Sequence, residues 1–311
     1  MRCCNCGHCY LNPVPDPSEL PTIYPPNYGN YSNSVDAGVS FRLKGWLEGK
    51  FLLAPMDSGL PENAAVLDIG CGDGRLLDGV RNHCPRAADL EGVEISEVAA
   101  EAAGKKGYVV HLGSFDEIQF PGNRYDLVFL IQVIEHVFDP VAAVRKIHAL
   151  LKPGGWVVFE TPSVRCVDFA LFKRRFWGGY HFPRHINLFE PGSFRKMLAS
   201  QGFDVASIKH KLQPVHWIWT CHHFFKSRGF PGWWTKSFHI KNVLWLTVFS
   251  CVDLLQLLFL RRSSNMQIIA QKRRTATVTE DVANSRADGN RIMPSLETEK
   301  DAACSAFVDV C

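Results

Sequence analysis

Short apolar runs alternate with segments of helical periodicity through the middle of the chain. The expected strands are Ala65–Ile69, Leu90–Glu94, Tyr108–Leu112, Asp126–Ile131 and Trp156–Glu160. The expected helices between them are Arg75–Arg81, Glu97–Lys106 and Pro140–Leu151. Strands that alternate with helices in this way form a parallel sheet joined by right-handed crossovers. We therefore expect an α/β fold with a doubly wound sheet, whose last two strands are Val205–Lys211 and Met266–Gln271.

The first of these strands runs into a loop with three glycines in five positions, Gly70-Cys71-Gly72-Asp73-Gly74, and a helix follows at once. Glycines let a ligand approach the backbone amides, and the helix N-terminus adds positive potential. A dinucleotide loop has the spacing Gly-x-Gly-x-x-Gly, whereas here the third glycine comes one residue early. Asp68, before the loop, favours a ligand that carries a cation, such as the ammonium and sulfonium of S-adenosylmethionine. Glu94, at the end of the second strand, can accept both hydroxyls of a ribose.

Later blocks of the chain extend this pattern. The strand-Asp-x-Gly-x-Gly-x-Gly loop with Glu94 resembles the class I S-adenosylmethionine-dependent methyltransferases, and residues 125–129, 132–137 and 151–155 match later family blocks in the same order. Residues 177–185 are similar to a subfamily related to ubiquinone and polysaccharide-pathway methyltransferases. The resemblance spans about residues 60–211 and implies a Rossmann-like, seven-stranded sheet.

The resemblance also implies which residues hold S-adenosylmethionine. The methionine moiety is assigned to Asp68, Gly70, Cys71, Gly72 and Gly74. The ribose is assigned to Glu94, and the adenine to Ser114 and Phe115. The region of the methyl group is assigned to Ile131 and Gln132. Ser114 departs from the family, which usually has Asp there, and this departure weakens the expected adenine recognition. For Ile131, packing in the core is an equal alternative.

Glu135 and His136 lie just past the fourth strand, where an open α/β sheet places its ligand crevice. Methyl transfer needs a general base only if the acceptor must lose a proton, and His136 is a candidate for that role. In ubiquinone-type relatives, a Glu three positions earlier helps this Glu-His pair to hold a divalent metal. Because that position is Gln132 here, we expect no metal. The structural alternative for the pair is helix capping and hydrogen bonding behind the site.

A second polar cluster, Tyr180, His181, Arg184 and His185, follows the fifth strand. Two imidazoles and a guanidinium suggest contacts with an anionic or phenolic acceptor. We hypothesise that His136 and His185 orient or deprotonate that acceptor, with Glu135 beside them. The alternative is a structural lid whose histidines bond backbone carbonyls.

Between the last two strands, about fifty residues (about 214–263) form a hydrophobic helical insertion that contains five of the eight tryptophans. Val243–Leu260 is nearly all apolar and just long enough to cross a bilayer. Asp253 in its middle, a winding polar stripe and the pairing of the flanking strands favour a helix on a membrane surface instead. A hydrophobic lid, a dimer face and a membrane span remain alternatives.

The ends of the chain differ from its middle. Residues 1–40 form an extended Pro- and Tyr-rich arm in which Cys3 and Cys6 have the spacing of half a zinc knuckle, and residues 41–274 form the methyltransferase domain. Residues 275–311 are expected to be a disordered acidic tail. Since the chain carries +3 and this tail carries −4, residues 1–274 carry +7. The modest overall charge opposes a general nucleic-acid binder, and eleven cysteines without a signal peptide indicate a cytoplasmic protein, or one peripheral to the inner face of a membrane.

These features predict an S-adenosylmethionine-dependent methyltransferase that acts on a small or lipid-linked acceptor at a membrane surface, with O-methylation favoured by the histidines. One rival is a nicotinamide-dependent dehydrogenase, which the glycine spacing and Asp68 oppose. The other is a catalytically degenerate cofactor-binding protein anchored by its Trp-rich insertion, which Ser114 and Gln132 keep open. The identity of the acceptor does not follow from the sequence.

Overall fold

The computed structural model describes residues 1–4, 6–23, 49–173 and 175–274. The strands are β1 Cys9–Tyr10, β2 Ala64–Ile69, β3 Ala87–Glu94, β4 Val109–Leu112, β5 Tyr125–Ile131, β6 Leu151–Pro162, β7 Asn187–Leu188, β8 Phe203–Lys211 and β9 Asn265–Lys272. The longer helices are α4 Arg75–His83, α5 Glu97–Lys105, α6 Pro140–Leu150, α7 Val167–Phe172, α8 Pro191–Ser200, α9 Pro214–Ser227, α10 Gly232–Ser237 and α11 Val243–Leu260. Short helical turns are η1 Pro17–Glu19, α1 Leu20–Ile23, η2 Gly49–Leu53, α3 Ala54–Asp57, η3 Ile134–His136 and η4 Gly178–Tyr180.

Seven strands form one sheet in the order β4-β3-β2-β5-β6-β9-β8, and this confirms the predicted doubly wound fold. Strands β4, β3, β2, β5 and β6 are parallel, whereas β9 runs antiparallel to both β6 and β8. The strand order reverses at β2, so β3 lies on one side of β2 and β5 on the other. A doubly wound sheet places its ligand at the carboxyl ends of the strands beside such a reversal.

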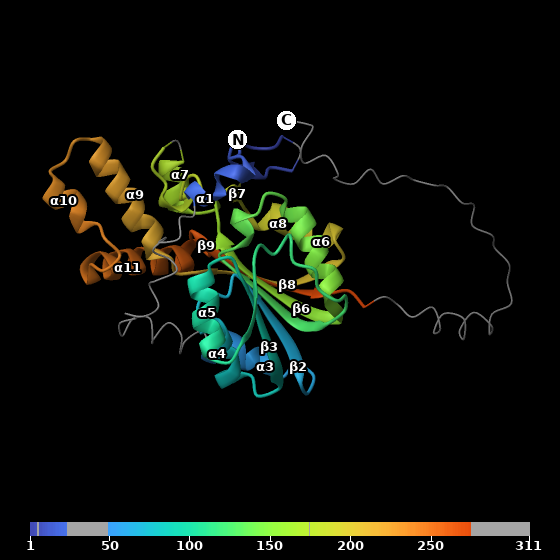
Figure 1. Cartoon of the computed structure of the whole chain (residues 1–311). Helices are drawn as coiled ribbons and strands as arrows, with labels where there is room; N and C mark the ends of the chain where they lie inside the picture. Colours follow the sequence, from blue (N-terminus) through green and yellow to red (C-terminus); the bar gives the residue numbers. More distant parts are fainter. Residues whose placement is uncertain (5, 24–48, 174, 275–311) are drawn as a thin grey trace, which may run out of the picture.

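Helices cover both faces of the sheet (Figure 1). On one face, α6 and α8 pack on the apolar side of β5 and β6, with Val144, Ile147 and Phe194 fully buried. On the other face, α4 buries Leu77 and Val80 against the sheet. Because both faces are covered, the central strands are mostly apolar and almost entirely buried. Every residue of β2 is buried, including Asp68.

The N-terminal arm differs from the extended arm predicted from its prolines. Cys9–Tyr10 is a strand that pairs with β7, and Pro17–Ile23 is helical. Proline is compatible with the first turn of a helix, where its missing N–H would have no partner, so Pro17 begins the helical segment instead of preventing it. The remainder of the predicted arm and the predicted acidic tail lie outside the described residues.

The insertion between β8 and β9 forms its own helical lobe. Helices α9, α10 and α11 lie together at one side of the sheet, with α7 next to them (Figure 1). Their shared core is aromatic: Trp217 stacks on Phe249 with ring centroids 5.9 Å apart, and Phe238 stacks on Trp245 at 4.4 Å. By length and composition α11 is a candidate membrane span, with a mean hydropathy of 2.1, and only 17% of it is buried.

Candidate functional site

The glycine loop between β2 and α4 has the backbone conformation that its sequence predicts. Gly70, Gly72 and Gly74 have φ angles of +79°, +55° and +80°, a region that other residues rarely adopt. The amides of Gly70 and Cys71 both donate to the carbonyl of Val93, which ties the loop to β3. A Cβ atom on Gly72 would meet no protein atom within 4 Å, so a ligand can approach its backbone.

Glu94 holds the same loop from the end of β3. Its Oε2 accepts the amide of Gly72 at 2.8 Å, and its Oε1 accepts the amides of Ile95 and Ser96, each at 2.9 Å. The residue is only 5% exposed. A carboxylate with this number of donors is fixed in place before a ligand arrives, and Oε2 has a second lone pair for a ribose hydroxyl.

Asp68 lies one strand away from Glu94 and is fully buried. Burial, followed by the nearby charge of Glu94, raises the pKa of Asp68 to about 7, while Arg75 acts in the opposite direction. Two buried acids beside an open glycine loop favour a ligand that carries positive charge and hydroxyl groups. The residues present therefore fit S-adenosylmethionine.

The structure places the remaining predicted cofactor residues nearby, with different surroundings. Phe115 is 7% exposed and packs in the core below α6, where the Lys146 ammonium lies 4.8 Å from its ring centroid. Ser114 is partly exposed, and its carbonyl accepts the amide of Glu117. Ile131 is partly exposed and packs against the core of the other face of the sheet. Cys71 is buried between α4 and α5, and burial raises the pKa of its thiol.

Gln132 belongs to a polar chain that the sequence did not reveal. The Lys211 ammonium and the Asn265 amide both donate to the Glu160 carboxylate, at 2.5 and 2.8 Å. Gln132 Nε2 donates to Asn265 Oδ1 at 3.1 Å. Because lysine only donates and a carboxylate only accepts, the amide orientation is fixed along the whole chain, and the Gln132 carbonyl points away from it. Gln132 also has a φ of +58°, which marks a constrained backbone at the end of β5.

Glu135, His136 and His185 lie close together, although 49 positions separate the two histidines in the sequence. The imidazole centroids are 4.8 Å apart, and one ligand atom from each of the three side chains lies within 4.8 Å of the others. His136 Nδ1 lies 3.0 Å from the carbonyl of Arg184, and His185 Nδ1 lies 2.8 Å from that of Gly179. A carbonyl only accepts, so both Nδ1 atoms carry the proton and each neutral ring has its lone pair on Nε2.

Burial sets the protonation of this cluster. Burial lowers the pKa of His136 to about 4 and that of His185 well below its usual value, so both rings are neutral at neutral pH. Burial raises the pKa of Glu135 to about 8 against the opposing hydrogen bond from Thr161, whose hydroxyl donates to Oε2 at 3.0 Å. All three groups are thus uncharged at neutral pH, and each imidazole has an unprotonated Nε2.

Tyr180, His181 and Arg184 line the same segment but point to different partners. His181 stacks edge-on with His185 at a centroid distance of 5.0 Å, and burial lowers its pKa to about 4. The Tyr180 hydroxyl donates to the carbonyl of Lys173. Arg184 Nε donates to the carbonyl of Ile23 in the N-terminal arm at 3.2 Å. Contact of these side chains with an acceptor stays a prediction, while the Arg184 carbonyl orients His136.

The N-terminal knuckle turn is formed, since the amide of Gly7 donates to the carbonyl of Cys3 and the amide of Cys3 donates to that of His8. Within the described ranges, the turn brings no group of three metal-ligating side chains together. The turn instead supports β1, whose partner strand β7 follows His185. The knuckle therefore supports the segment of residues 177–185 that carries His185.

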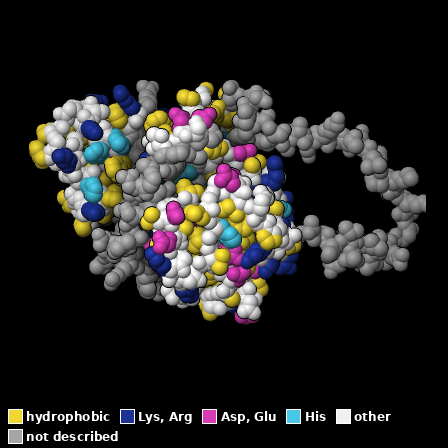
Figure 2. Space-filling view, viewed as in Figure 1, with side chains coloured by type: hydrophobic (Ala, Val, Ile, Leu, Met, Phe, Trp, Pro, Cys, Tyr) yellow, Lys and Arg dark blue, Asp and Glu magenta, His cyan; other side chains and the backbone are white. Residues whose placement is uncertain are grey.

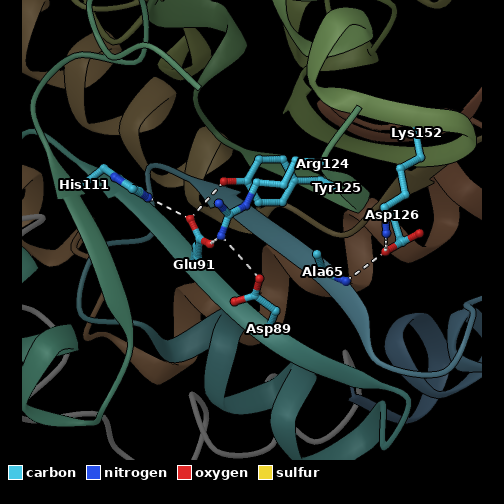
Figure 3. Close-up of polar contacts among 8 residues, drawn as sticks. All are labelled: Ala65, Asp89, Glu91, His111, Arg124, Tyr125, Asp126 and Lys152. Carbon is cyan, nitrogen blue, oxygen red and sulfur yellow. Dashed lines mark hydrogen bonds and ion pairs between the residues drawn. The ribbon is translucent and has the colours of Figure 1, made fainter. Parts of the chain in front are cut away.

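The Tyr125-Asp126 motif, which carries part of the resemblance, serves the fold (Figure 3). The Asp126 carboxylate accepts the Ala65 amide at 2.9 Å and the Lys152 ammonium at 2.6 Å, so it joins β2, β5 and β6. The Tyr125 hydroxyl donates to the buried carboxylate of Glu91, which also contacts His111 and Arg124. These networks fix the register of the strands that place the cofactor loop.

Comparison with known proteins agrees with this geometry. A family model described as a methyltransferase domain matches residues 47–208. The ubiquinone biosynthesis O-methyltransferase of Alkalilimnicola ehrlichii is 34% identical over 112 residues, which are 32% of this chain and 42% of that protein. An uncharacterised methyltransferase of Schizosaccharomyces pombe is 31% identical over 140 residues, 41% of this chain and 50% of that protein. The chain spans about half the length of the curated relatives it matches.

Two solved structures share the fold at low sequence identity. The complex of the Haloferax volcanii Trm112 methyltransferase activator with a putative methyltransferase aligns with a TM-score of 0.52 and 15% identity, over 84% of this chain and 100% of that one. A putative sarcosine dimethylglycine methyltransferase from Galdieria sulphuraria gives 0.50 and 17%, over 75% and 86%. The chain therefore has a Rossmann-like fold of the kind found in these methyltransferases. It belongs to the methyltransferase domain family.

Proposed function

We propose that the protein transfers the methyl group of S-adenosylmethionine to a hydroxyl oxygen of a small or lipid-linked acceptor at a membrane surface. The pair of neutral imidazoles at the end of β5 carries this proposal. An oxygen acceptor must lose its proton as it is methylated, and a neutral imidazole nitrogen is suited to take it. A thioether or a tertiary amine has no proton to lose, so such an acceptor does not require a base of this kind.

The chain's own residues would divide the work as follows. Asp68, Glu94 and the glycine loop bind the cofactor, which supplies an activated methyl group and its own leaving group. Nε2 of His136 or His185 accepts the hydroxyl proton of the acceptor. The carbonyls of Arg184 and Gly179 hold the two rings in the required tautomer and stabilise positive charge that develops on them.

The surrounding segments keep water from His185 and Glu135, while His136 is partly exposed. His185 is 8% exposed and Glu135 is fully buried. The N-terminal arm lies over the segment that holds the histidines, because the amide of Leu11 donates to the carbonyl of Ile186 at 2.8 Å. A desolvated base and a positioned acceptor supply most of what an in-line methyl transfer requires of a protein.

The proposal is tested by incubating the protein with S-adenosylmethionine labelled in its methyl group and a panel of phenols and catechols, with and without an isoprenoid tail. Mass spectrometry locates the labelled methyl group. We expect it on an oxygen of at least one phenolic compound. Transfer only to nitrogen or carbon acceptors offered in the same panel would contradict O-methylation.

A catalytically degenerate cofactor-binding protein is the alternative, and Ser114 is the observation that favours it. Ser114 replaces the acid that usually contacts adenine in the resembling family. On this alternative, the protein binds S-adenosylmethionine but transfers label to no acceptor in any class. Restoring the acid by Ser114→Asp would then tighten cofactor binding without producing turnover.

A further inference from the structure

Helix α11 buries its most polar side chains and exposes most of its leucines, the reverse of what is usual for a helix in contact with water. Its polar residues Asp253 and Gln256 are 0% and 5% exposed, whereas Leu258 and Phe259 are 65% and 78% exposed. The other exposed apolar residues of α11 are Val243, Leu244, Val248, Leu254, Leu255 and Leu260. Trp219 in α9, Phe230 before α10 and Trp233 in α10 are also exposed. We call these residues, with Leu258 and Phe259, the outer face of the lobe. An exposed apolar surface of this extent marks a site that something covers.

The inward orientation of the polar residues is fixed by hydrogen bonds to α7, to α9 and to the residue before α9. The Asp253 carboxylate accepts the Gln213 amide at 2.7 Å and the Trp217 indole N–H at 3.1 Å. Gln256 Oε1 accepts the amide of Val167 at 3.2 Å, and its Nε2 donates to Asp253. Rotating α11 to bury its leucines would leave these groups without partners, so the apolar side stays outside.

The charge of the lobe identifies what covers it. Residues 214–263 contain six lysines and arginines and a single acid, Asp253, which is buried. The bases lie at the ends of the three helices: Lys226 in the last turn of α9 and Arg228 just after it, Lys236 in α10, Lys241 before α11, and Arg261 and Arg262 after it. Figure 2 shows basic and apolar side chains side by side on this lobe. Basic groups that flank an apolar helix face match an anionic lipid surface. A second copy of the same lobe would carry the same charge and repel it.

The lobe leaves the sheet at the edge that carries the site. Lys211, at the end of β8, and Asn265, at the start of β9, pair with each other, and Asn265 pairs with Pro162 at the carboxyl end of β6. Both ends of the insertion are therefore fixed beside Gln132 and Glu160. A helix that crossed a bilayer would have to leave this edge, whereas a helix in the plane of the membrane surface keeps it intact.

The lobe also contacts the segment of residues 177–185 directly. The amide of Gly178 donates to the Thr220 hydroxyl of α9 at 2.7 Å. A Cβ on Gly178 would lie 2.2 Å from the carbonyl of His216, so α9 and η4 pack too closely for any side chain there. Helix α9 thus supports the turn whose Gly179 carbonyl orients His185.

We propose, resting on the methyl transfer proposed above, that the outer face of the lobe inserts into an anionic phospholipid bilayer with α11 parallel to the membrane surface. The acceptor then reaches the histidines from that bilayer. The leucines and aromatics of the outer face enter the acyl boundary, and the five exposed bases, which are all six except Arg262, contact the headgroups. The polar side of α11 stays bound to the domain. The acceptor class is then a hydroxylated, lipid-embedded molecule.

Flotation of the full-length protein tests this surface with vesicles of phosphatidylcholine alone and of equal parts phosphatidylcholine and phosphatidylglycerol. The protein should float with the mixed vesicles and be released by a carbonate wash. The double variant Leu258→Glu, Phe259→Glu should bind them about 100-fold more weakly, because two apolar side chains lose their burial. Val109→Glu is the matched control, since Val109 is 58% exposed on β4 at the opposite edge of the sheet.

Wild-type protein that stays at the bottom with both vesicles would overturn the proposal, as would a double variant that floats like the wild type. Retention through the carbonate wash would overturn the in-plane orientation in favour of a span. If the double variant instead converts a lipid-free dimer to a monomer in size-exclusion chromatography, a second copy covers the face. S-adenosylmethionine binding is measured by calorimetry on each variant. Unchanged binding with lost flotation supports the lipid surface, whereas absent binding in the wild type counts against the methyl transfer alone.

Discussion

The contacts of Glu94 allow a prediction with a worked magnitude for the variant Glu94→Gln. The glutamine has one acceptor oxygen, whereas the glutamate accepts two amides on Oε1 and the Gly72 amide on Oε2. The side-chain carbonyl should keep the pair at Ile95 and Ser96, so the NH₂ group then faces the Gly72 amide, donor against donor. The loop loses one charge-assisted hydrogen bond, which is worth about 1.5–3 kcal/mol.

Because the Gly72 amide belongs to the cofactor loop, this loss should appear as weaker binding of S-adenosylmethionine. About 3 kcal/mol corresponds to an affinity lower by about 100-fold, and about 1.5 kcal/mol to about ten-fold. Isothermal calorimetry measures this dissociation constant directly. Glu101→Gln on α5 is the matched control, since its side chain is 66% exposed and its ion pair with Lys105 lies in solvent. A folded Glu94→Gln protein with the wild-type dissociation constant would refute the role given to Glu94.

Three further predictions follow from the acceptor side. Gly178→Ala should lower turnover about 10- to 100-fold, because the added Cβ displaces the Gly179 carbonyl that orients His185. Calorimetry should show unchanged cofactor binding, and unchanged turnover would contradict the packing role. The pKa of Glu135 is about 8 in the folded protein and about 4.5 in the unfolded chain, so its contribution to stability is lost as the pH rises through this range. In Glu135→Gln, the free energy of unfolding in urea should therefore depend less on pH than in the wild type. An identical pH profile would contradict this. Chelation by EDTA should leave methyl transfer intact, because the position of the third metal ligand in ubiquinone-type relatives is Gln132, whose amide is bound to Asn265. Loss of activity that a divalent ion restores would contradict this.

The sheet was predictable because its signals are local. Apolar runs such as residues 65–69 and 126–131 are long enough to be buried on both faces, and the glycine loop marks where the first strand ends. The observed bounds of these two strands differ from the prediction by a single residue. The helical insertion was likewise visible in the sequence, because tryptophans and an apolar run without a turn signal interrupt the pair of last strands.

The orientation of side chains at the site was not predictable, because distant segments determine it. Arg184 had the chemistry of an anion ligand, yet its guanidinium contacts the arm at Ile23 and its carbonyl orients His136. Gln132 looked like a lost metal ligand, but Asn265, 133 positions away, explains it as part of a hydrogen-bonded chain. The arm was wrongly predicted to lack helix and strand, since its proline content hid a short pairing with β7.

The most direct test of the proposed chemistry is single-turnover transfer of a labelled methyl group from S-adenosylmethionine to a phenolic acceptor by the double variant His136→Ala, His185→Ala. The two imidazoles are the basic groups in contact at the end of β5, with centroids 4.8 Å apart. We predict that the double variant binds the cofactor with the wild-type dissociation constant and transfers the methyl group about 100-fold more slowly, the range for loss of a general base. Wild-type transfer by this variant would contradict the proposed chemistry, because the proton of the acceptor would then leave by another route.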